Sequence, residues 1–389
     1  MKTGARLHID AVTLALVSAI LLLGLIMVTS ASISIASKDG GDSFSFLERQ
    51  LVLCFIGALL ATLVFCIRTD YLEKMAWPML IAALVLLFVV LVPGLGHVVN
   101  GSRRWIRVLG FNFQASELAR VLTLIFIASY AVRREDELRS TAFGLIKPMG
   151  LLVFIALLLL AEPDFGAASV LFVTGFGILF IAGARLRYVL AAGALGAGAA
   201  SLLVLLVPYR MARVTSFLDP WADPYNSGFQ LTQSLIAIGR GEWFGVGLGE
   251  SVQKLFYLPE AHTDFLFAVL AEELGLVGVV VTLTLFIGLV WRSFWIARLA
   301  SRAGLKFQAY LALGFGLWLG AQALINIGVN MGVLPTKGLT LPLMSYGRSS
   351  MIVTLAWVGL LLRVYHEAMQ SGRGMATTRR EEGLAGAHA

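Results

Sequence analysis

The chain has 389 residues, of which 58% are hydrophobic and only 14% are charged. Soluble globular domains have about 45–50% apolar and about 25% charged residues, so this composition indicates an integral membrane protein. It excludes an ordinary cytosolic enzyme, a disulfide scaffold and a disordered regulator. The net charge of +7 agrees with membrane topology and anionic lipid partners, and we expect no nucleic-acid partner.

Ten apolar segments in chain order predict an all-α polytopic fold with about ten transmembrane helices. Sorting the Lys and Arg residues by side favours a cytoplasmic location for both termini. We expect one transmembrane domain over 1–370, with a large outer loop at about 208–264, and a disordered cytoplasmic tail over 371–389. The ten segments are about 10–32, 48–67, 74–93, 116–132, 147–161, 165–184, 188–207, 265–291, 307–328 and 346–366.

Two short polar stretches on the predicted outer side have a structural interpretation. Ser116 is a plausible N-cap, and Glu117 and Arg120 have the i, i+3 spacing of a helical ion pair, although a substrate role is an equal alternative. Glu162 and Asp164 bracket a proline in a tight turn, where Asp164 can cap the next helix. For this turn we favour structure over function.

The segment 208–264 is too long for a simple connection, and loops of this length are usually functional. The apolar run 233–238 predicts a short helix at the membrane interface. Arg210 and Arg213 lie on the outer side, where the topological rule does not call for positive charge. They are therefore candidates for binding the phosphates of a lipid pyrophosphate, with solvated loop charge as the alternative.

Asp264 stands at the mouth of the eighth apolar segment, close to Glu260 and His262 in sequence. A partly desolvated carboxylate at this depth suits a general base. It could equally bind a divalent cation such as Mg²⁺ or Mn²⁺ together with Glu260 or His262, or simply cap the helix. Glu272 and Glu273 lie about two turns deeper, where we expect them to be paired.

Prolines and glycines interrupt the stretch between the last two apolar segments. Because it cannot form a regular helix, we expect a re-entrant or surface loop that packs on protein. Its cations Lys337 and Arg348 are well placed to meet a phosphate, although lone loop lysines are usually solvated. Ser345 belongs to the same stretch.

Together these motifs resemble the shape, elongation, division and sporulation (SEDS) family of bacterial membrane proteins, from the first apolar segment to the tenth. Glu162 to Asp164 and Pro335 to Gly338 look like the cell-division branch. Three residues depart from the usual motifs: Ala115, Glu242 and Arg348. The matching stretches are 100–105, 114–118, 162–166, 217–221, 233–237, 257–275 and 335–350.

The resemblance implies a peptidoglycan glycosyltransferase that polymerises lipid II on the outer face of the cytoplasmic membrane, at the division septum. It also implies a class B penicillin-binding protein and other division membrane proteins as partners. The essential aspartate of the family falls on Asp264. Asp264 and Glu260 are also the candidate metal ligands inferred above from the residues themselves. The substrate-binding candidates are Lys337, Arg348, Arg213, Arg210, Glu260, His262 and Ser345.

Two other classes of function remain as alternatives. A lipid II flippase would explain the many apolar segments and the outer cations, but it should carry polar residues along a path between both faces. A noncatalytic scaffold of the division machinery would leave the residues around Asp264 unexplained.

Overall fold

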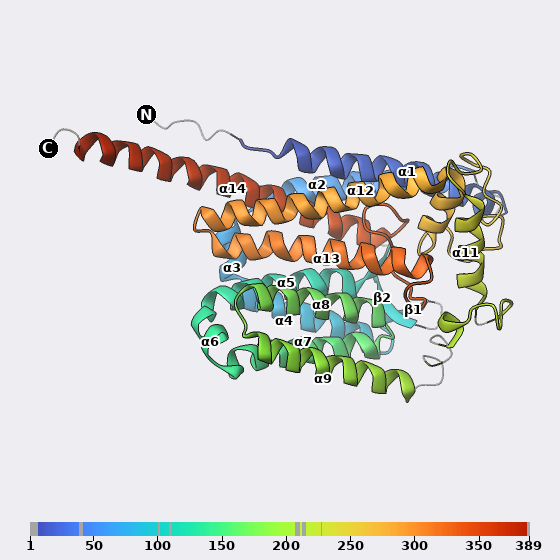
Figure 1. The fold of residues 1–389 in the computed structure, drawn as a ribbon, viewed down its shortest axis with the longest axis horizontal. Coiled ribbons are helices and arrows are strands. Elements are labelled where there is room, and N and C mark those ends of the chain that lie inside the picture. Colours follow the sequence, from blue (N-terminus) through green and yellow to red (C-terminus); the bar gives the residue numbers. More distant parts are fainter. Residues whose placement is uncertain are drawn as a thin grey trace.

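The computed structural model is a bundle of long helices (Figure 1). It describes residues 7–38, 42–99, 102–108, 111–206, 211, 215–226 and 228–386. Each of the ten predicted apolar segments coincides with one helix. These helices are α1 (Ala11–Lys38), α2 (Ser45–Cys66), α4 (Ala76–Leu91), α5 (Ala115–Arg133), α7 (Ala142–Ala161), α8 (Phe165–Ile181), α9 (Leu186–Leu205), α12 (Leu266–Arg302), α13 (Lys306–Asn330) and α14 (Arg348–Gly386).

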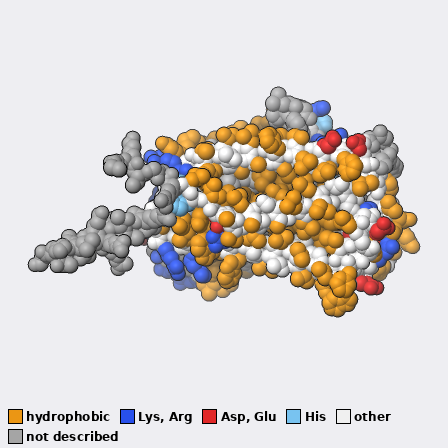
Figure 2. All heavy atoms as spheres, turned by 90° about the horizontal axis from the view of Figure 1, so that it is seen from above, with side chains coloured by type: hydrophobic (Ala, Val, Ile, Leu, Met, Phe, Trp, Pro, Cys, Tyr) orange, Lys and Arg blue, Asp and Glu red, His pale blue; other side chains and the backbone are white. Residues whose placement is uncertain are grey.

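Length and composition support the predicted membrane fold. Among the described residues, seven helices are long and apolar enough to cross a bilayer, and three shorter apolar helices accompany them, in α4, α8 and the first part of α9. Large apolar side chains such as Phe55, Leu195 and Trp291 are more than two-thirds exposed on the outside of the bundle. Apolar side chains cover much of the surface in Figure 2, as expected where the solvent is lipid.

The two ends of the bundle differ in what they carry. Helix α1 begins and helix α14 ends at one end, whereas α11 (Phe229–Arg240) and the strands lie at the other (Figure 1). Lys and Arg side chains gather at the first end in Figure 2, and Asp and Glu side chains are visible at the second. Two termini at one end fit an even number of crossings. The cytoplasmic location of that end stays a prediction, as do the domain boundary at 370 and the disorder of 371–389.

Short elements connect the long helices. Helices α3 (Thr69–Lys74) and α6 (Glu135–Ser140) lie between longer ones, and α11 contains the short helix predicted at 233–238. A small antiparallel sheet is a feature that the all-α prediction missed. It consists of β1 (Gly96–Val99), β2 (Ser102–Val108) and β3 (Phe111–Gln114), in the order β1-β2-β3. Such short strands depend on pairing with neighbours, which the sequence pattern does not reveal.

A break in α12 joins the outer loop to the bundle. Gly275 has a φ of 64° inside the helix, a conformation that favours glycine. A Cβ atom at Gly275 would lie 2.3 Å from the backbone nitrogen of Gly245, so the two chains touch through their backbones. The Leu276 amide donates to the Glu242 carbonyl (2.9 Å). The loop after α11 is thereby fixed against α12, which places the segment leading to Asp264.

Candidate active site

A cavity of about 700 Å³ lies at the end of the bundle that carries the strands. It is lined by β2 and β3, the turn between α7 and α8 with the start of α8, Gln230 of α11, the segment just before α12, and the loop between α13 and α14 with the start of α14. Five of the predicted site residues meet there although they come from two segments far apart in sequence. They are Asp264, Glu260, His262, Lys337 and Arg348.

Asp264 is held in place by helix α13. Its backbone carbonyl accepts hydrogen bonds from the side-chain amides of Asn326 (2.8 Å) and Asn330 (3.0 Å). Helix α12 begins at Leu266 with Phe265 as the N-cap, and the amide of Ala268 in its first turn donates to Oδ1 of Asn330 on α13 (3.1 Å). Phe265, and not Asp264, thus occupies the N-cap position that the sequence analysis offered as an alternative role for Asp264.

The Asp264 carboxylate faces the loop between α13 and α14. A Cβ atom added at Gly338 would lie 3.0 Å from Oδ2 of Asp264, so the carboxylate is against the backbone of this loop. The next residue along the chain toward the N-terminus is Lys337, whose Nζ lies 4.2 Å from the centre of the Phe165 ring. A lysine held over an aromatic face is not simply solvated.

The loop itself is irregular and packed on protein, as the sequence predicts. Its apolar residues Leu339, Leu341 and Met344 are at most 5% exposed. The Leu341 amide donates to Oγ of Ser345 (3.0 Å), and Ser345 is itself buried. Ser345 is not among the residues that line the cavity, and its hydroxyl shapes the loop, so its predicted contact with substrate stays a prediction.

His262 supports the wall of the cavity. Its ring packs against Phe46 and Tyr346, with centroid separations of 5.1 and 5.7 Å, and its carbonyl accepts from the Tyr346 amide (3.0 Å). Burial lowers the pKa of His262, so the neutral imidazole is favoured. Glu260 has a φ of 56°, and its Oε2 accepts from the Thr263 hydroxyl (2.7 Å).

The turn between α7 and α8 adds a second pair of carboxyl groups beside the cavity. Oδ1 of Asp164 accepts from the Ala167 amide (3.0 Å), which confirms the predicted cap of α8. Its Oδ2 accepts from the side chains of Gln114 and Ser116, both at 3.0 Å. Ser116 is therefore not the N-cap of α5, which is Gln114, because its hydroxyl joins two segments instead.

Glu162 is completely buried, and neither carboxyl oxygen has a hydrogen-bond partner among the described residues. Burial, together with the nearby charge of Asp164, raises the pKa of Glu162 to about 8, although Arg104 opposes the shift. At neutral pH this carboxyl group is therefore mostly protonated.

Arg104 is the site residue that the sequence analysis missed as a candidate. It lies on β2, lines the cavity, and donates from Nη2 to the Ser102 hydroxyl (3.0 Å). The available signal was its positive charge on the predicted outer face. Arg210 and Arg213 lie outside the described residues, so their predicted contacts stay predictions.

The acidic residues below the cavity are paired, as predicted. Glu117 and Arg120 form a buried ion pair of 2.5 Å in α5. Glu272 pairs with Arg240 (3.1 Å) and Glu273 with Lys254 (2.8 Å). The pairs of Glu272 and Glu273 connect the outer loop with the bundle, whereas the pair of Glu117 and Arg120 lies within α5.

The comparisons with known proteins agree with this geometry. Residues 10–370 match the family of cell cycle proteins that comprises FtsW, RodA and SpoVE. The chain belongs to this family. It is 58% identical over 357 residues to the probable peptidoglycan glycosyltransferase FtsW of Thioalkalivibrio sulfidiphilus, which covers 92% of this chain and 89% of the relative. The corresponding protein of Methylococcus capsulatus is 52% identical over 375 residues, with 96% of this chain and 94% of the relative covered.

Solved structures of the family share the fold. A chain from a structure described as "Structural coordination of polymerization and crosslinking by a peptidoglycan synthase complex" aligns with a TM-score of 0.73 and 35% identity, over 94% of this chain and 100% of that chain. RodA of Thermus thermophilus, a rod shape determining protein, aligns with a TM-score of 0.66 and 32% identity, over 92% of this chain and 97% of that chain. The resemblance inferred from the motifs is thus confirmed at the level of sequence and of fold.

The described residues of this family member contain no group of three or more His, Cys, Asp and Glu side chains that could hold a metal ion. Asp264 and Glu260 both line the cavity, so two carboxylates are available there. Two carboxylates suit Mg²⁺, which usually takes its other ligands from waters and substrate phosphates. Metal binding at this position stays a prediction.

Proposed function

We propose that the protein polymerises lipid II in the cavity at the outer end of the bundle, with Asp264 as the general base. The protein is a peptidoglycan glycosyltransferase, the class named for its relatives at 50–58% identity over most of the chain. The observation that carries the assignment of the site is the meeting of Asp264 with Lys337 and Arg348 in one cavity, across the loop between α13 and α14.

The reaction joins two lipid-linked disaccharides through a β-1,4 bond. The acceptor hydroxyl attacks the anomeric carbon of the donor, and the undecaprenyl pyrophosphate leaves with inversion at that carbon. Asp264 takes the hydroxyl proton as the new bond forms. A positioned general base contributes about 10²–10⁴-fold to such a step. The hydrogen bonds from Asn326 and Asn330 to the backbone carbonyl of Asp264 fix the position of this residue in the cavity wall.

The leaving pyrophosphate needs positive charge. Lys337, Arg348 and Arg104 line the cavity and supply it, because charge-assisted hydrogen bonds to phosphate are stronger than neutral ones. Arg348 and Arg104 can each present two parallel N–H groups to a phosphate, whereas Lys337 acts as a point charge. Asp264 and Glu260 would hold a divalent cation, which would add positive charge to stabilise the leaving group.

The partners and the place of action follow from the same proposal. A class B penicillin-binding protein would crosslink the glycan strands, and the coordination of polymerisation and crosslinking in the related synthase complex supports this pairing. The cavity would face the periplasm at the division septum. The flippase and scaffold alternatives are not favoured, because the relatives are named for a transferase and the described cavity gathers its polar groups at one end.

Asp264→Asn tests the proposed base, since it keeps the size of the side chain and removes its ability to take a proton. We expect polymerisation of lipid II by the purified complex with its penicillin-binding partner to fall at least about 100-fold. Gel analysis of the glycan strands measures this loss. The matched control is Glu250→Gln, an exposed carboxylate of the outer loop, which should leave the rate unchanged.

Copurification of the partner and the melting temperature check that the Asp264→Asn protein is folded and assembled. If the folded and assembled Asp264→Asn variant polymerised lipid II at the wild-type rate, Asp264 would not be the general base. Transfer of lipid II across vesicles without any polymer, by the wild-type complex, would support the flippase instead.

A further inference from the structure

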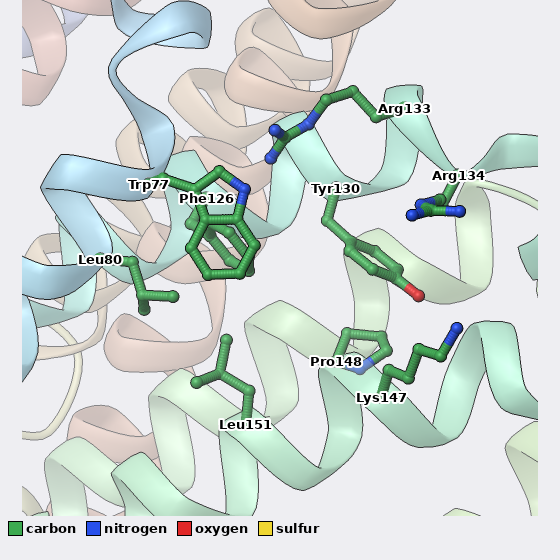
Figure 3. A pocket seen from close by; sticks show the side chains of 9 residues that line it. All are labelled: Trp77, Leu80, Phe126, Tyr130, Arg133, Arg134, Lys147, Pro148 and Leu151. Atoms are coloured by element: carbon green, nitrogen blue, oxygen red, sulfur yellow. The ribbon is translucent and has the colours of Figure 1, made fainter.

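A second cavity, of about 420 Å³, lies at the opposite end of the bundle from the proposed active site. It is formed between α4, α5 and α7, and its residues are drawn in Figure 3. No step of the proposed reaction uses it. It is lined by Trp77, Leu80, Phe126, Tyr130, Arg133, Arg134, Lys147, Pro148 and Leu151.

A proline inside α7 shapes one wall of this cavity. Pro148 has no backbone N–H, so the carbonyl of Gly144 lacks its helical partner. The hydroxyl of Tyr130 on α5 donates to this carbonyl (2.9 Å). This hydrogen bond fixes the Tyr130 ring between α5 and α7, so this wall of the cavity is preorganised for a ligand.

The lining changes from charged to apolar along the helix axes. On α5, Phe126 lies seven residues before Arg133, which is about 10 Å deeper in the bundle. On α7, Leu151 lies one turn deeper than Lys147. Trp77 packs edge-on against Phe126, with ring centres 4.9 Å apart, and its side chain is half exposed at the end of the bundle. In Figure 3 the three cations lie on one side of the cavity and the two leucines on the other.

Positive charge exceeds negative charge at the rim. Glu137 pairs with both Arg134 (3.5 Å) and Lys147, so one carboxylate serves two cations. Arg133 has no ion pair among the described residues, and its Nε donates only to the Ser129 carbonyl (3.4 Å). Glu73 also interacts electrostatically with Arg133, which opposes the rise that burial causes in the pKa of Glu73.

We propose that this cavity binds the phosphate headgroup of an anionic phospholipid, with Arg133 and Lys147 on the phosphate and the acyl chains against Leu80, Leu151 and Trp77. Basic pockets between transmembrane helices on the cytoplasmic side are suited to such headgroups. Half-exposed tryptophan at this depth is typical of the membrane interface. A free phosphate ion would use the cations but would gain nothing from the apolar wall.

The double variant Arg133→Gln/Lys147→Gln tests the site. The probe is dioleoyl phosphatidylglycerol, added to the full-length protein in detergent, with phosphatidylcholine as the neutral lipid. Native mass spectrometry measures the lipid that stays bound, and the rise in melting temperature gives an independent measure. We expect the wild type to retain phosphatidylglycerol over phosphatidylcholine, and the affinity to fall roughly fivefold for each cation removed.

The matched control is Arg298→Gln/Arg302→Gln, which removes two exposed cations from the same end of the bundle but outside the cavity. It should bind phosphatidylglycerol like the wild type. An equal loss of phosphatidylglycerol affinity in this control would show that general surface charge causes the effect, and this would contradict the proposed site. Equal retention of the two lipids by the wild type would also overturn it, whether or not the double variant folds.

Competition separates the possible sources of the phosphate. Inorganic phosphate at millimolar concentration should not displace phosphatidylglycerol from the wild-type protein. Complete displacement would indicate a site for the free ion, and a polyprenyl pyrophosphate as the sole copurified lipid would indicate a substrate site. Either result contradicts the proposal, whereas displacement by other anionic phospholipids alone supports it.

Discussion

The carboxyl group of Glu162 lies beside a cavity lined with cations, yet it makes no ion pair or hydrogen bond within the described part of the chain. The nearby donors bond to Asp164, two residues later, which accepts hydrogen bonds from the Ala167 amide and from the side chains of Gln114 and Ser116. If both Glu162 and Asp164 were ionised, two like charges would lie close together in a buried turn, which would raise the free energy of the folded state. The environment therefore keeps the proton on Glu162 and leaves Asp164 to accept the hydrogen bonds.

This arrangement predicts how stability depends on pH. The pKa of Glu162 is raised from 4.5 to about 8 in the folded protein. Between these values the unfolded chain loses the proton and the folded chain keeps it, so the stability contributed by Glu162 falls as pH rises from about 4.5 to 8. Glu162→Gln removes this titration. The variant should match the wild type near pH 5 and melt higher by at least about 2 °C at pH 8 and above.

Thermal unfolding in detergent at a series of pH values measures the difference. The control Glu250→Gln, an exposed side chain, should follow the wild type at every pH. If the melting temperatures of Glu162→Gln and the wild type stay parallel from pH 5 to 9, Glu162 does not hold its proton in the folded state.

Among the secondary-structure elements, the long apolar helices were predicted best, because hydropathy alone determines them. All ten apolar segments form helices, because an apolar run long enough for a bilayer has few other stable structures. The irregular loop before α14 and the cap of α8 by Asp164 also follow from local chemistry, proline and glycine in one case and a short carboxylate in the other.

The parts that depend on distant contacts were predicted less well. The strands β1 to β3 are short, and β2 carries three arginines, so their pairing could not be predicted from a pattern of alternating side chains. Arg104 lines the cavity from β2, next to the Trp105–Gln114 pair that joins β2 to β3. Ser116 and Ser345 were assigned by their position in motifs. The Ser116 hydroxyl instead donates to Asp164 in another segment, and the Ser345 hydroxyl accepts from the Leu341 amide in its own loop. The meeting of Asp264 with Lys337 came from the resemblance to a family.

Elements of the outer loop are joined to the bundle by a buried ionic cluster. Nζ of Lys254 lies 2.8 Å from Glu273 on α12 and 3.0 Å from the hydroxyl of Ser30 on α1, and Ser30 also donates to Glu273 (2.7 Å). Both charged side chains are at most 6% exposed. Removing one partner of such a pair leaves a buried charge, which costs about 3–5 kcal/mol.

Lys254→Met should therefore lower the melting temperature far more than Lys306→Met, which breaks the exposed pair with Glu135 and should cost no more than about 1 kcal/mol. Combining Lys254→Met with Glu273→Gln should recover part of the loss, since no buried charge is then left alone. Thermal unfolding of the four proteins measures these differences. Equal effects of the two lysine variants would mean that the cluster does not hold the outer loop.

For the whole molecule, the decisive question is which end of the bundle faces the cytoplasm. The end where α1 begins and α14 ends carries a cluster of Lys and Arg side chains, whereas the proposed active site lies at the other end (Figures 1 and 2). Short basic segments are retained on the cytoplasmic side during insertion. We therefore predict that the cavity around Asp264 lies on the outer side, where a polymer must emerge, and that the cavity around Arg133 lies in the inner leaflet.

Single cysteines test this orientation in a chain whose native thiols are replaced, by Cys54→Ser and Cys66→Ser. Glu250→Cys at the strand-bearing end should react with a membrane-impermeant maleimide in spheroplasts, because that side is exposed to the medium. Ser301→Cys, in the exposed end of α12, should react only after the membrane is opened. The reverse pattern would put Asp264 in the cytoplasm, and a lipid-linked sugar polymerised there could not be added to a wall outside the membrane.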